Sequence, residues 1–336
     1  MSGRMDRRKF LQATVAGATI SVSAPYISSQ AAPLTMRFAH FAAEDHPANI
    51  AAKQFASNVE KRTNGAIKVN IFPNNALGGP PEQAQQIKLG TIDMGLPTQG
   101  QLDKYDTAFA AVMLPFIWDN PQHALRVLDG PAMAWLAPLA EKQGFVLLRN
   151  WEYGFRNVTN TVRPINTPDD VKGLELRTPP ELQIQASMEA LGATVQAIAF
   201  PELYLALSQK VVDGQENPIA VIYFNKFYEV QKHLAITRHN NMIHTVSAMT
   251  WSKLNADQQA IFREESATAS DLMRKLIADQ EDDQIKKIEA AGMQLTRPNI
   301  PSFRALMGPA YERISAYAGS DNVRKFQQMA EQGRNG

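Results

Sequence analysis

Cysteine is absent from the 336 residues, which excludes disulfides, thiolate nucleophiles and metal or iron–sulfur sites with cysteine ligands. The net charge is close to zero, at +1, so no overall positive field attracts nucleic acid or anionic lipid. Charged residues make up 20% of the chain, too many for a protein with several membrane-spanning helices. What remains is an ordinary globular composition, sufficient for one large or two medium domains.

The motifs of common catalytic and cofactor sites are also missing. The chain has no GxGxxG after an expected strand, no Walker loop, no HExxH and no GxSxG. Gly78–Pro81 is rich in glycine, but its two prolines remove N–H donors that a phosphate would need. Glu44, Asp45 and His46 are the densest group of possible metal ligands, and they fit better as a polar loop that caps a helix after Pro47. The sequence therefore gives no positive sign of an enzyme.

The first thirty residues have the pattern of an export signal. Paired arginines at positions 7 and 8 precede Phe10 and Leu11, and a short uncharged stretch with Ser, Thr and Gly follows. A small-x-small cleavage pattern ends at Ala31. The arginine block resembles a twin-arginine signal, with an ordinary secretory signal as the alternative. We expect residues 1–31 to be removed and the mature protein to lie in the periplasm.

Strand and helix patterns alternate beyond this segment. Apolar residues recur at helical spacing from Ala48 to Arg62, between extended segments at 34–41 and 67–72. Further strands are expected at 91–96, 145–151, 174–177 and 194–198, and further helices at 81–89, 121–143 with an interruption near Gly130, 181–191 and from Phe200. This alternation predicts an α/β protein with largely parallel strand pairing.

The segment from Asn255 to Ala291 is the longest expected helix. Asn255 suits an N-cap, Gly292 suits a C-terminal stop, and no proline or glycine lies between them. At 1.5 Å per residue the helix is about 50 Å long. Because one small domain cannot bury so long a helix, we expect it to cross between two lobes.

Several long motifs occur in a fixed order along the chain. They are RFAHFAAEDHP (37–47), LGTIDMGLP (89–97), RPINTPDDVKGLELR (163–177), VVDGQENP (211–218) and KFYEVQK (226–232). Together they closely resemble the solute-binding proteins of tripartite ATP-independent periplasmic (TRAP) transporters, the DctP-like family. The resemblance implies a two-lobed α/β fold that closes a cleft around one small organic anion. It also implies delivery to a membrane permease with a small and a large subunit.

The resemblance and the chain order imply the extent of each lobe. Lobe I is expected to contain residues 33–153 and 244–282, and lobe II residues 154–243 and 283–336. The tail is expected to pack on lobe II through the apolar residues Phe303, Leu306, Tyr311 and Ile314. We expect a monomer without a nucleic-acid partner.

The resemblance also implies how the ligand carboxylate is held. Arg177 occupies the position of the family's anchoring arginine, whose planar guanidinium suits a bidentate salt bridge. Arg156 matches a second arginine at the ligand, with an ion pair inside the lobe as the alternative. Asn217 matches an asparagine that binds the carboxylate, and Phe200 an aromatic wall, with ordinary core packing as the alternative. Glu216 is expected to hold local backbone or the surroundings of Arg177 rather than the anion.

The first lobe is expected to select the rest of the ligand. The candidates there are Phe41, Glu44, Thr98, Gln99 and Gln101, and possible aromatic faces are Trp151, Tyr153 and Tyr223. Phe41 and Gln101 depart from the asparagine and arginine of the sialic acid-binding members, which disfavours sialic acid. Neutral Thr98, Gln99 and Gln101 suit hydroxyls better than a second carboxylate. We therefore expect a hydroxylated sugar acid such as an aldonate or uronate.

Three alternatives stay open at this point. A C4-dicarboxylate could be held at its two ends by Arg156 and Arg177. A sensory receptor could use the same fold, and an exported hydrolase is a third possibility. We expect a receptor rather than an enzyme, with no cofactor. We also expect no metal, since the members that bind 2-oxo acids through a metal lack the Gln-Glu-Asn-Pro form found at 215–218.

Overall fold

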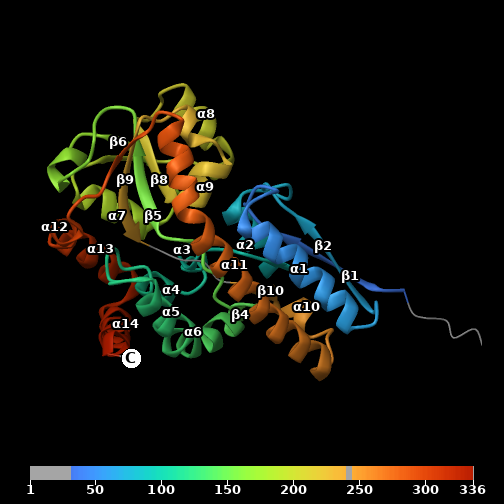
Figure 1. The fold of residues 1–336 in the computed structure, drawn as a ribbon. Helices are drawn as coiled ribbons and strands as arrows, with labels where there is room; N and C mark the ends of the chain where they lie inside the picture. The colour runs from blue at the N-terminus through green and yellow to red at the C-terminus, as the bar shows by residue number, and fades with distance from the viewer. Residues whose placement is uncertain (1–31, 240–243, 336) are drawn as a thin grey trace, which may run out of the picture. The chain divides into compact units, whose positions relative to one another are not determined.

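Two β-sheets organise residues 33–336 of the computed structural model, which describes residues 32–239 and 244–335 (Figure 1). The expected export signal lies outside these ranges. Each sheet gathers strands from distant parts of the sequence, and the helices surround them. We call the parts built on the first and second sheets the first and second lobes.

The sheet of the first lobe has five strands in the order β2-β1-β3-β10-β4. Its strands are β1 (Leu34–Ala39), β2 (Ile67–Phe72), β3 (Met94–Gly95), β4 (Phe145–Arg149) and β10 (His244–Ser247). Met36 and Phe38 of β1 are fully buried while Thr35 and Arg37 are exposed, because successive side chains of a strand point to opposite faces.

The sheet of the second lobe has six strands in the order β11-β9-β5-β8-β6-β7. Its strands are β5 (Arg156–Asn160), β6 (Glu175–Thr178), β7 (Thr194–Ala197), β8 (Gly214–Pro218), β9 (His233–His239) and β11 (Gln294–Thr296). β5 and β8 are mostly polar, yet both are buried over their whole length. A Cβ on Gly214 would lie 2.0 Å from the backbone oxygen of Thr159, so glycine permits the close approach of these two strands.

The expected alternation of strands and helices is confirmed. Five of the nine strand pairs in the described ranges are parallel, among them β9 with β11, but each sheet also contains an antiparallel strand that was not expected. β1 pairs with β2 and β3 in parallel, and β6 pairs with β7 and β8 in parallel. β5 is antiparallel to both its neighbours, and so is β10. In sequence, β4 of the first sheet is followed by β5 of the second, and β9 of the second sheet is followed by β10 of the first. Such strands lack the crossover helix within one sheet that makes successive strands parallel.

The helices fall into three groups. Those of the first lobe are α1 (Pro47–Arg62), α2 (Pro80–Lys88), α3 (Gln99–Leu102), α4 (Ala108–Ala111), α5 (Pro121–Asp129), α6 (Pro131–Lys142) and α10 (Ala248–Trp251). Those of the second lobe are η1 (Pro168–Val171), α7 (Leu182–Ala190), η2 (Phe200–Glu202), α8 (Leu203–Ser208), α9 (Ile219–Phe224) and η3 (Phe227–Glu229). Those after the long helix are α12 (Ile300–Arg304), α13 (Gly308–Ala318), α14 (Ser320–Gln332) and η4 (Gly333–Asn335). The expected interruption near Gly130 is confirmed, since α5 ends and α6 begins there.

The long helix α11 (Ala256–Ala290) joins the two lobes, as its length predicted (Figure 1). The side chain of Asn255 caps it by accepting a hydrogen bond from the N–H of Gln258. The helix packs on α1 and β4 of the first lobe and on α9 of the second. It also binds the segment that leads from β4 to β5. Ser266 accepts a hydrogen bond from the indole of Trp151 (3.1 Å), and Ser270 donates one to the backbone oxygen of Asn150 (2.7 Å).

The tail after α11 departs from expectation at its end. Phe303 and Ile314 are buried, but Leu306 is 40% exposed. α13 packs on α7 of the second lobe and also on α4 of the first. The last helix, α14, packs instead on α4, α5 and α6 of the first lobe. Phe326 anchors it there in the apolar cluster of those helices, and the imidazole Nε2 of His123 lies 2.7 Å from the backbone oxygen of Ala330.

Within the described ranges, no helix has both the length and the apolar character that crossing a membrane would require.

Two buried histidines mark the connection from β1 to α1. His46 is the N-cap of α1, and its Nδ1 accepts a hydrogen bond from the N–H of Ala48 (3.0 Å), which confirms the capping interpretation of this loop. Nδ1 of His40 accepts from the N–H of Ala42 (3.2 Å). Burial lowers the pKa of His40 to about 4 and that of His46 to about 3. Both rings are therefore neutral at pH 7.

We predict that His46 makes the fold sensitive to acid. Its pKa is lower in the folded state than the 6.5 of the unfolded chain, so the unfolded state takes up the proton first. Stability that is complete above pH 6.5 falls as the pH drops toward the folded pKa, by about 2 kcal/mol between pH 7 and pH 5. His46→Asn keeps a capping oxygen but does not titrate, so urea unfolding at the two pH values should show a loss about 2 kcal/mol smaller. An equal loss in both proteins would show that His46 is not held neutral by burial.

Candidate ligand-binding site

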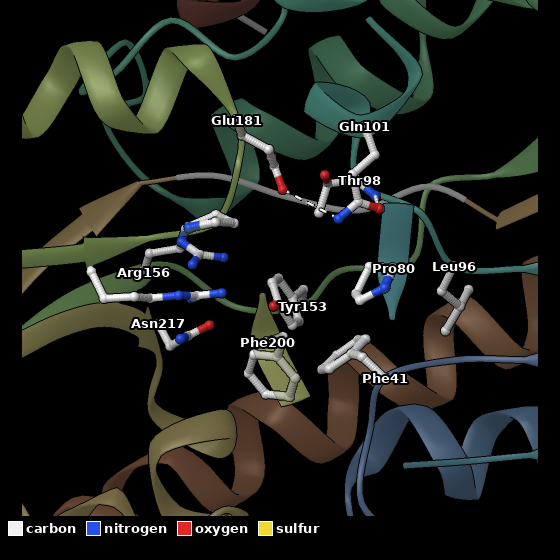
Figure 2. A pocket seen from close by; sticks show the side chains of 12 residues that line it. Phe41, Pro80, Leu96, Thr98, Gln101, Tyr153, Arg156, Glu181, Phe200 and Asn217 are labelled. Atoms are coloured by element: carbon white, nitrogen blue, oxygen red, sulfur yellow. Dashed lines mark hydrogen bonds between the residues drawn. The ribbon is translucent and has the colours of Figure 1, made fainter. Parts of the chain in front are cut away.

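A cavity lies among residues of both lobes (Figure 2). The first lobe contributes Phe41, Pro80, Leu96, Thr98 and Gln101, and the other lining residues are Tyr153, Arg156, Arg177, Pro179, Glu181, Phe200 and Asn217. Seven of the nine residues expected at the ligand therefore surround this one cavity. They come from segments as distant in sequence as β1 and β8.

Arg156 on β5 is paired within the protein. Its Nε and Nη2 donate to the carboxylate of Glu216 on the neighbouring strand β8, and Nη2 also donates to the backbone oxygen of Glu216 (2.8 Å). Arg156 is 3% exposed and Glu216 is fully buried. Burial alone would lower the pKa of Arg156, but the carboxylate charge of Glu216 raises it above its ordinary value. The ion pair that was the alternative for Arg156 is thus present, although the side chain also lines the cavity.

Arg177 on β6 has unused hydrogen-bonding capacity. Its Nε donates to the backbone oxygen of Ile198 (2.8 Å), while its Nη2 has no hydrogen-bond partner among the described residues. The side chain is 1% exposed, and burial lowers its pKa to about 10, so it still carries its charge at neutral pH. Its Cζ lies 6.0 Å from the ring centroid of Phe200. A buried guanidinium with a free donor at a cavity is suited to bind an anion.

Glu181 is a cavity residue that the sequence interpretation missed. It lies immediately before α7 and is 2% exposed. Its Oε1 accepts from Nε2 of Gln101 (3.3 Å), and its Oε2 has no hydrogen-bond partner among the described residues. A Cβ on Gly100 would lie 2.4 Å from Oε2, so glycine there lets the carboxyl group approach α3. In the sequence, Glu181 resembles an ordinary acidic residue at a helix start, and only its position four residues after Arg177 could have indicated a role.

Aromatic and polar groups occupy different sides of the cavity. The ring centroid of Phe41 lies 4.9 Å from that of Tyr153 and 5.9 Å from that of Phe200. Figure 2 shows Phe41 and Phe200 on the side opposite Glu181 and Gln101. Such a cavity can cover the carbon face of a ligand and still offer hydrogen bonds along its polar edge.

The amide of Gln101 has a second bond within the protein besides the one to Glu181, and the amide of Asn217 has one. Oε1 of Gln101 accepts from the N–H of Thr98 (3.2 Å) at the start of α3, while Nδ2 of Asn217 donates to Oε1 of Gln215. These bonds fix the orientation of both amide groups at the cavity wall.

Two of the expected site residues do not line the cavity. The side chain of Glu44 is 58% exposed and bonds to Lys53 (2.8 Å) and Asn49 (3.0 Å). Gln99 is buried on α3, away from the cavity lining.

Of the possible aromatic faces, only Tyr153 lines the cavity. Trp151 packs in the core against Phe38, with ring centroids 5.8 Å apart, and Tyr223 stacks on Tyr228 at 6.0 Å. The part of the chain that the structure describes contains no group of three or more histidine, aspartate and glutamate side chains that could hold a metal ion.

Comparison with known proteins identifies the family. The model of the DctP family, described as bacterial extracellular solute-binding protein, family 7, matches residues 38–317. The uncharacterised protein y4mM of Sinorhizobium fredii is 34% identical over 283 residues, which are 84% of this chain but 52% of that relative. The C4-dicarboxylate-binding periplasmic protein DctP of Rhodobacter capsulatus is 30% identical over 328 residues, 95% of this chain and 97% of the relative.

Two solved structures share the fold over most of their length. A TRAP periplasmic solute-binding protein from Polaromonas sp. JS666, bound to D-erythronate, is 32% identical with a TM-score of 0.84 and covers 88% of this chain and 98% of its own. The sugar acid-binding protein DctPAm from Advenella mimigardefordensis, in complex with galactonate, is 29% identical with a TM-score of 0.85 and covers 90% and 99%. The chain belongs to the DctP family of solute-binding proteins, the periplasmic receptors that bind small organic acids for TRAP transporters and work with their membrane permease subunits.

Proposed function

We propose that this protein is a periplasmic TRAP receptor for a hydroxylated monocarboxylate, such as an aldonate or a uronate. The observation that carries the proposal is the difference between the two cavity arginines. Arg156 has a carboxylate partner in Glu216, whereas Arg177 has none among the described residues. The cavity therefore offers one guanidinium that has no carboxylate directly bonded to it among the described residues, which matches one ligand carboxylate.

The same charges argue against a dicarboxylate, the second candidate, which the name of the Rhodobacter capsulatus relative supports. A dicarboxylate held at both ends would need a second free cation. Arg156 already donates to Glu216, and Glu181 adds a further acidic group to the lining. The erythronate and galactonate bound to the two similar structures are hydroxylated monocarboxylates, in keeping with the favoured ligand class.

The proposed mechanism is capture and delivery. A ligand that contacts Arg177 on the second lobe and Thr98 or Gln101 on the first favours the closed arrangement of the lobes through its contacts to both. The closed receptor then docks on the permease. The segment 1–31 is proposed as the export signal that brings the chain to the periplasm, where we expect a monomer.

A calorimetric ligand panel tests the proposal. The purified protein is titrated with D-erythronate, D-galactonate and D-galacturonate, and with succinate and malate for comparison. We expect at least one monocarboxylate to bind more than tenfold tighter than either dicarboxylate. It should return chemically unchanged after release, unlike a hydrolase substrate. A protein that binds only succinate or malate would contradict the proposed ligand class.

A further inference from the structure

We propose that Glu181 determines which acids this receptor accepts: its carboxylate binds a hydroxyl group of the ligand and excludes a ligand with a second carboxylate at that position. The inference deepens the proposed function and depends on it for the placement of the first carboxylate at Arg177. It concerns the end of the ligand that Arg177 does not hold.

The position of Glu181 gives it access to that end. It lines the same cavity as Arg177 and Asn217, yet its carboxyl group reaches the first lobe, where Gln101 donates to it (3.3 Å). Figure 2 shows Glu181 beside Gln101 and Thr98, on the polar side of the cavity. A ligand that extends from Arg177 toward the first lobe meets this carboxyl group.

The bonding state of Glu181 indicates what it accepts. Its Oε2 is a buried acceptor without a hydrogen-bond partner among the described residues, and buried acceptors are normally paired. A ligand hydroxyl can donate to it, whereas a ligand carboxylate offers only acceptors. Two carboxylates in contact within a dry cavity also repel each other strongly. The same group therefore favours one class of acid and disfavours the other.

The charged groups around Glu181 set the pH at which this discrimination operates. They are Arg156 on β5, Arg177 on β6, Glu216 on β8 and Asp103 after α3, with Thr98 and Gln101 as neutral neighbours. Burial raises the pKa of Glu181 to about 7, aided by the charges of Asp103 and Glu216 and opposed by that of Arg156. Above pH 7 the group is an anion. Below pH 7 it carries a proton that it can donate to a second ligand carboxylate, so the exclusion of diacids should weaken there.

Matched ligands isolate the contribution of Glu181. D-erythronate and meso-tartrate differ only at one terminal carbon. This carbon is a CH2OH group in D-erythronate and a carboxylate in meso-tartrate. Galactonate and galactarate form a longer pair of the same kind. Titration calorimetry at pH 8 gives the ratio of the two dissociation constants for each pair, and this ratio measures the discrimination directly.

Glu181→Gln is the test variant, since glutamine keeps the shape and removes the charge. We expect the preference of the wild type for the monoacid to fall at least tenfold in the variant, through weaker binding of the monoacid and tighter binding of the diacid. Glu189→Gln is the matched control, because it is the same change near the other end of α7, at an exposed ion pair with Arg313 outside the cavity. It should keep the wild-type ratio.

Each outcome decides between the two proposals. If the wild type binds a monoacid and Glu181→Gln keeps the same ratio, the role of Glu181 is refuted while the proposed function stands. If the wild type binds none of these acids, both proposals fail.

The pH dependence of the wild type provides a second measurement that needs no variant. Between pH 8 and pH 6 the affinity for the diacid relative to that for the monoacid should rise about tenfold, because Glu181 takes up its proton. A ratio constant with pH would contradict the inference.

Discussion

Replacing Arg177 with alanine should weaken binding of every organic acid by about 30-fold or more. Truncation of one partner of a buried, hydrogen-bonded charge pair costs about 2–5 kcal/mol, because the other charge is left without its counterion. Here the group left behind is the ligand carboxylate in a cavity whose other arginine is already paired with Glu216. Isothermal titration of the wild type and Arg177→Ala with the tightest acid of the panel measures the loss.

The ligand-free stability of this variant provides the control on folding. Arg177 is 1% exposed and has no carboxylate partner in the described structure, so its charge is costly to bury when no ligand is bound. We therefore expect the melting temperature of the ligand-free protein to change little. Arg297→Ala removes an exposed arginine outside the cavity and should bind normally. Near-normal affinity in Arg177→Ala would show that the ligand is anchored elsewhere.

Replacing Arg156 with methionine should destabilise the fold by about 3–5 kcal/mol. The substitution leaves the carboxylate of Glu216, which is fully buried, without its bidentate partner. Urea unfolding at pH 7.5 measures the cost. The double variant Arg156→Met, Glu216→Gln should recover most of the lost stability, since it removes the carboxylate charge of Glu216 along with the guanidinium of Arg156.

The comparison of single and double variants distinguishes two roles for Arg156. If the arginine serves mainly the fold, the two substitutions are strongly non-additive and the double variant still melts cooperatively. If the costs of Arg156→Met and Glu216→Gln simply add, the pair does not stabilise β5 against β8. Ligand titration of the refolded double variant then shows how much Arg156 contributes at the cavity beyond the ion pair.

Strong periodic patterns predicted several elements well. The helix expected at 48–62 is α1, the strand expected at 67–72 is β2, and the capped segment after Asn255 is α11. In each, apolar spacing and end signals such as Asn255 and Gly292 agree, so local sequence determines the outcome. The antiparallel direction of β5 and β10 could not be predicted, because it depends on where the chain crosses between the sheets, which no local pattern records.

Buried polar strands could not be found by periodicity. β5 and β8 consist mainly of polar residues, although both lie fully inside the protein. Hydrophobic alternation is therefore absent, and only the motif resemblance drew attention to Arg156 and Asn217. The pairing of Arg156 with Glu216 follows from the antiparallel register of these strands. Arg156 lies opposite Pro218 and Val158 lies opposite Glu216, so Glu216 is two residues from the position facing Arg156, on the same face of the sheet.

The polar residues near α3 show a further limit of sequence reasoning. Thr98, Gln99 and Gln101 are similar in chemistry, but only Thr98 and Gln101 line the cavity. Residues three apart share one face of a helical turn, and Gln99 falls outside that face. Glu181 was missed because its neighbour Gln101 lies 80 positions away in sequence.

The last two helices have a consequence for motion. α13 packs both on α7 of the second lobe and on α4 of the first, and α14 packs on α4, α5 and α6, so the end of the chain contacts both lobes. Between α13 and α14 lies Gly319, whose φ of 88° suits glycine. A rotation that separates the lobes must therefore break the contacts of α13 with α4 or with α7, so this helix opposes the opening movement.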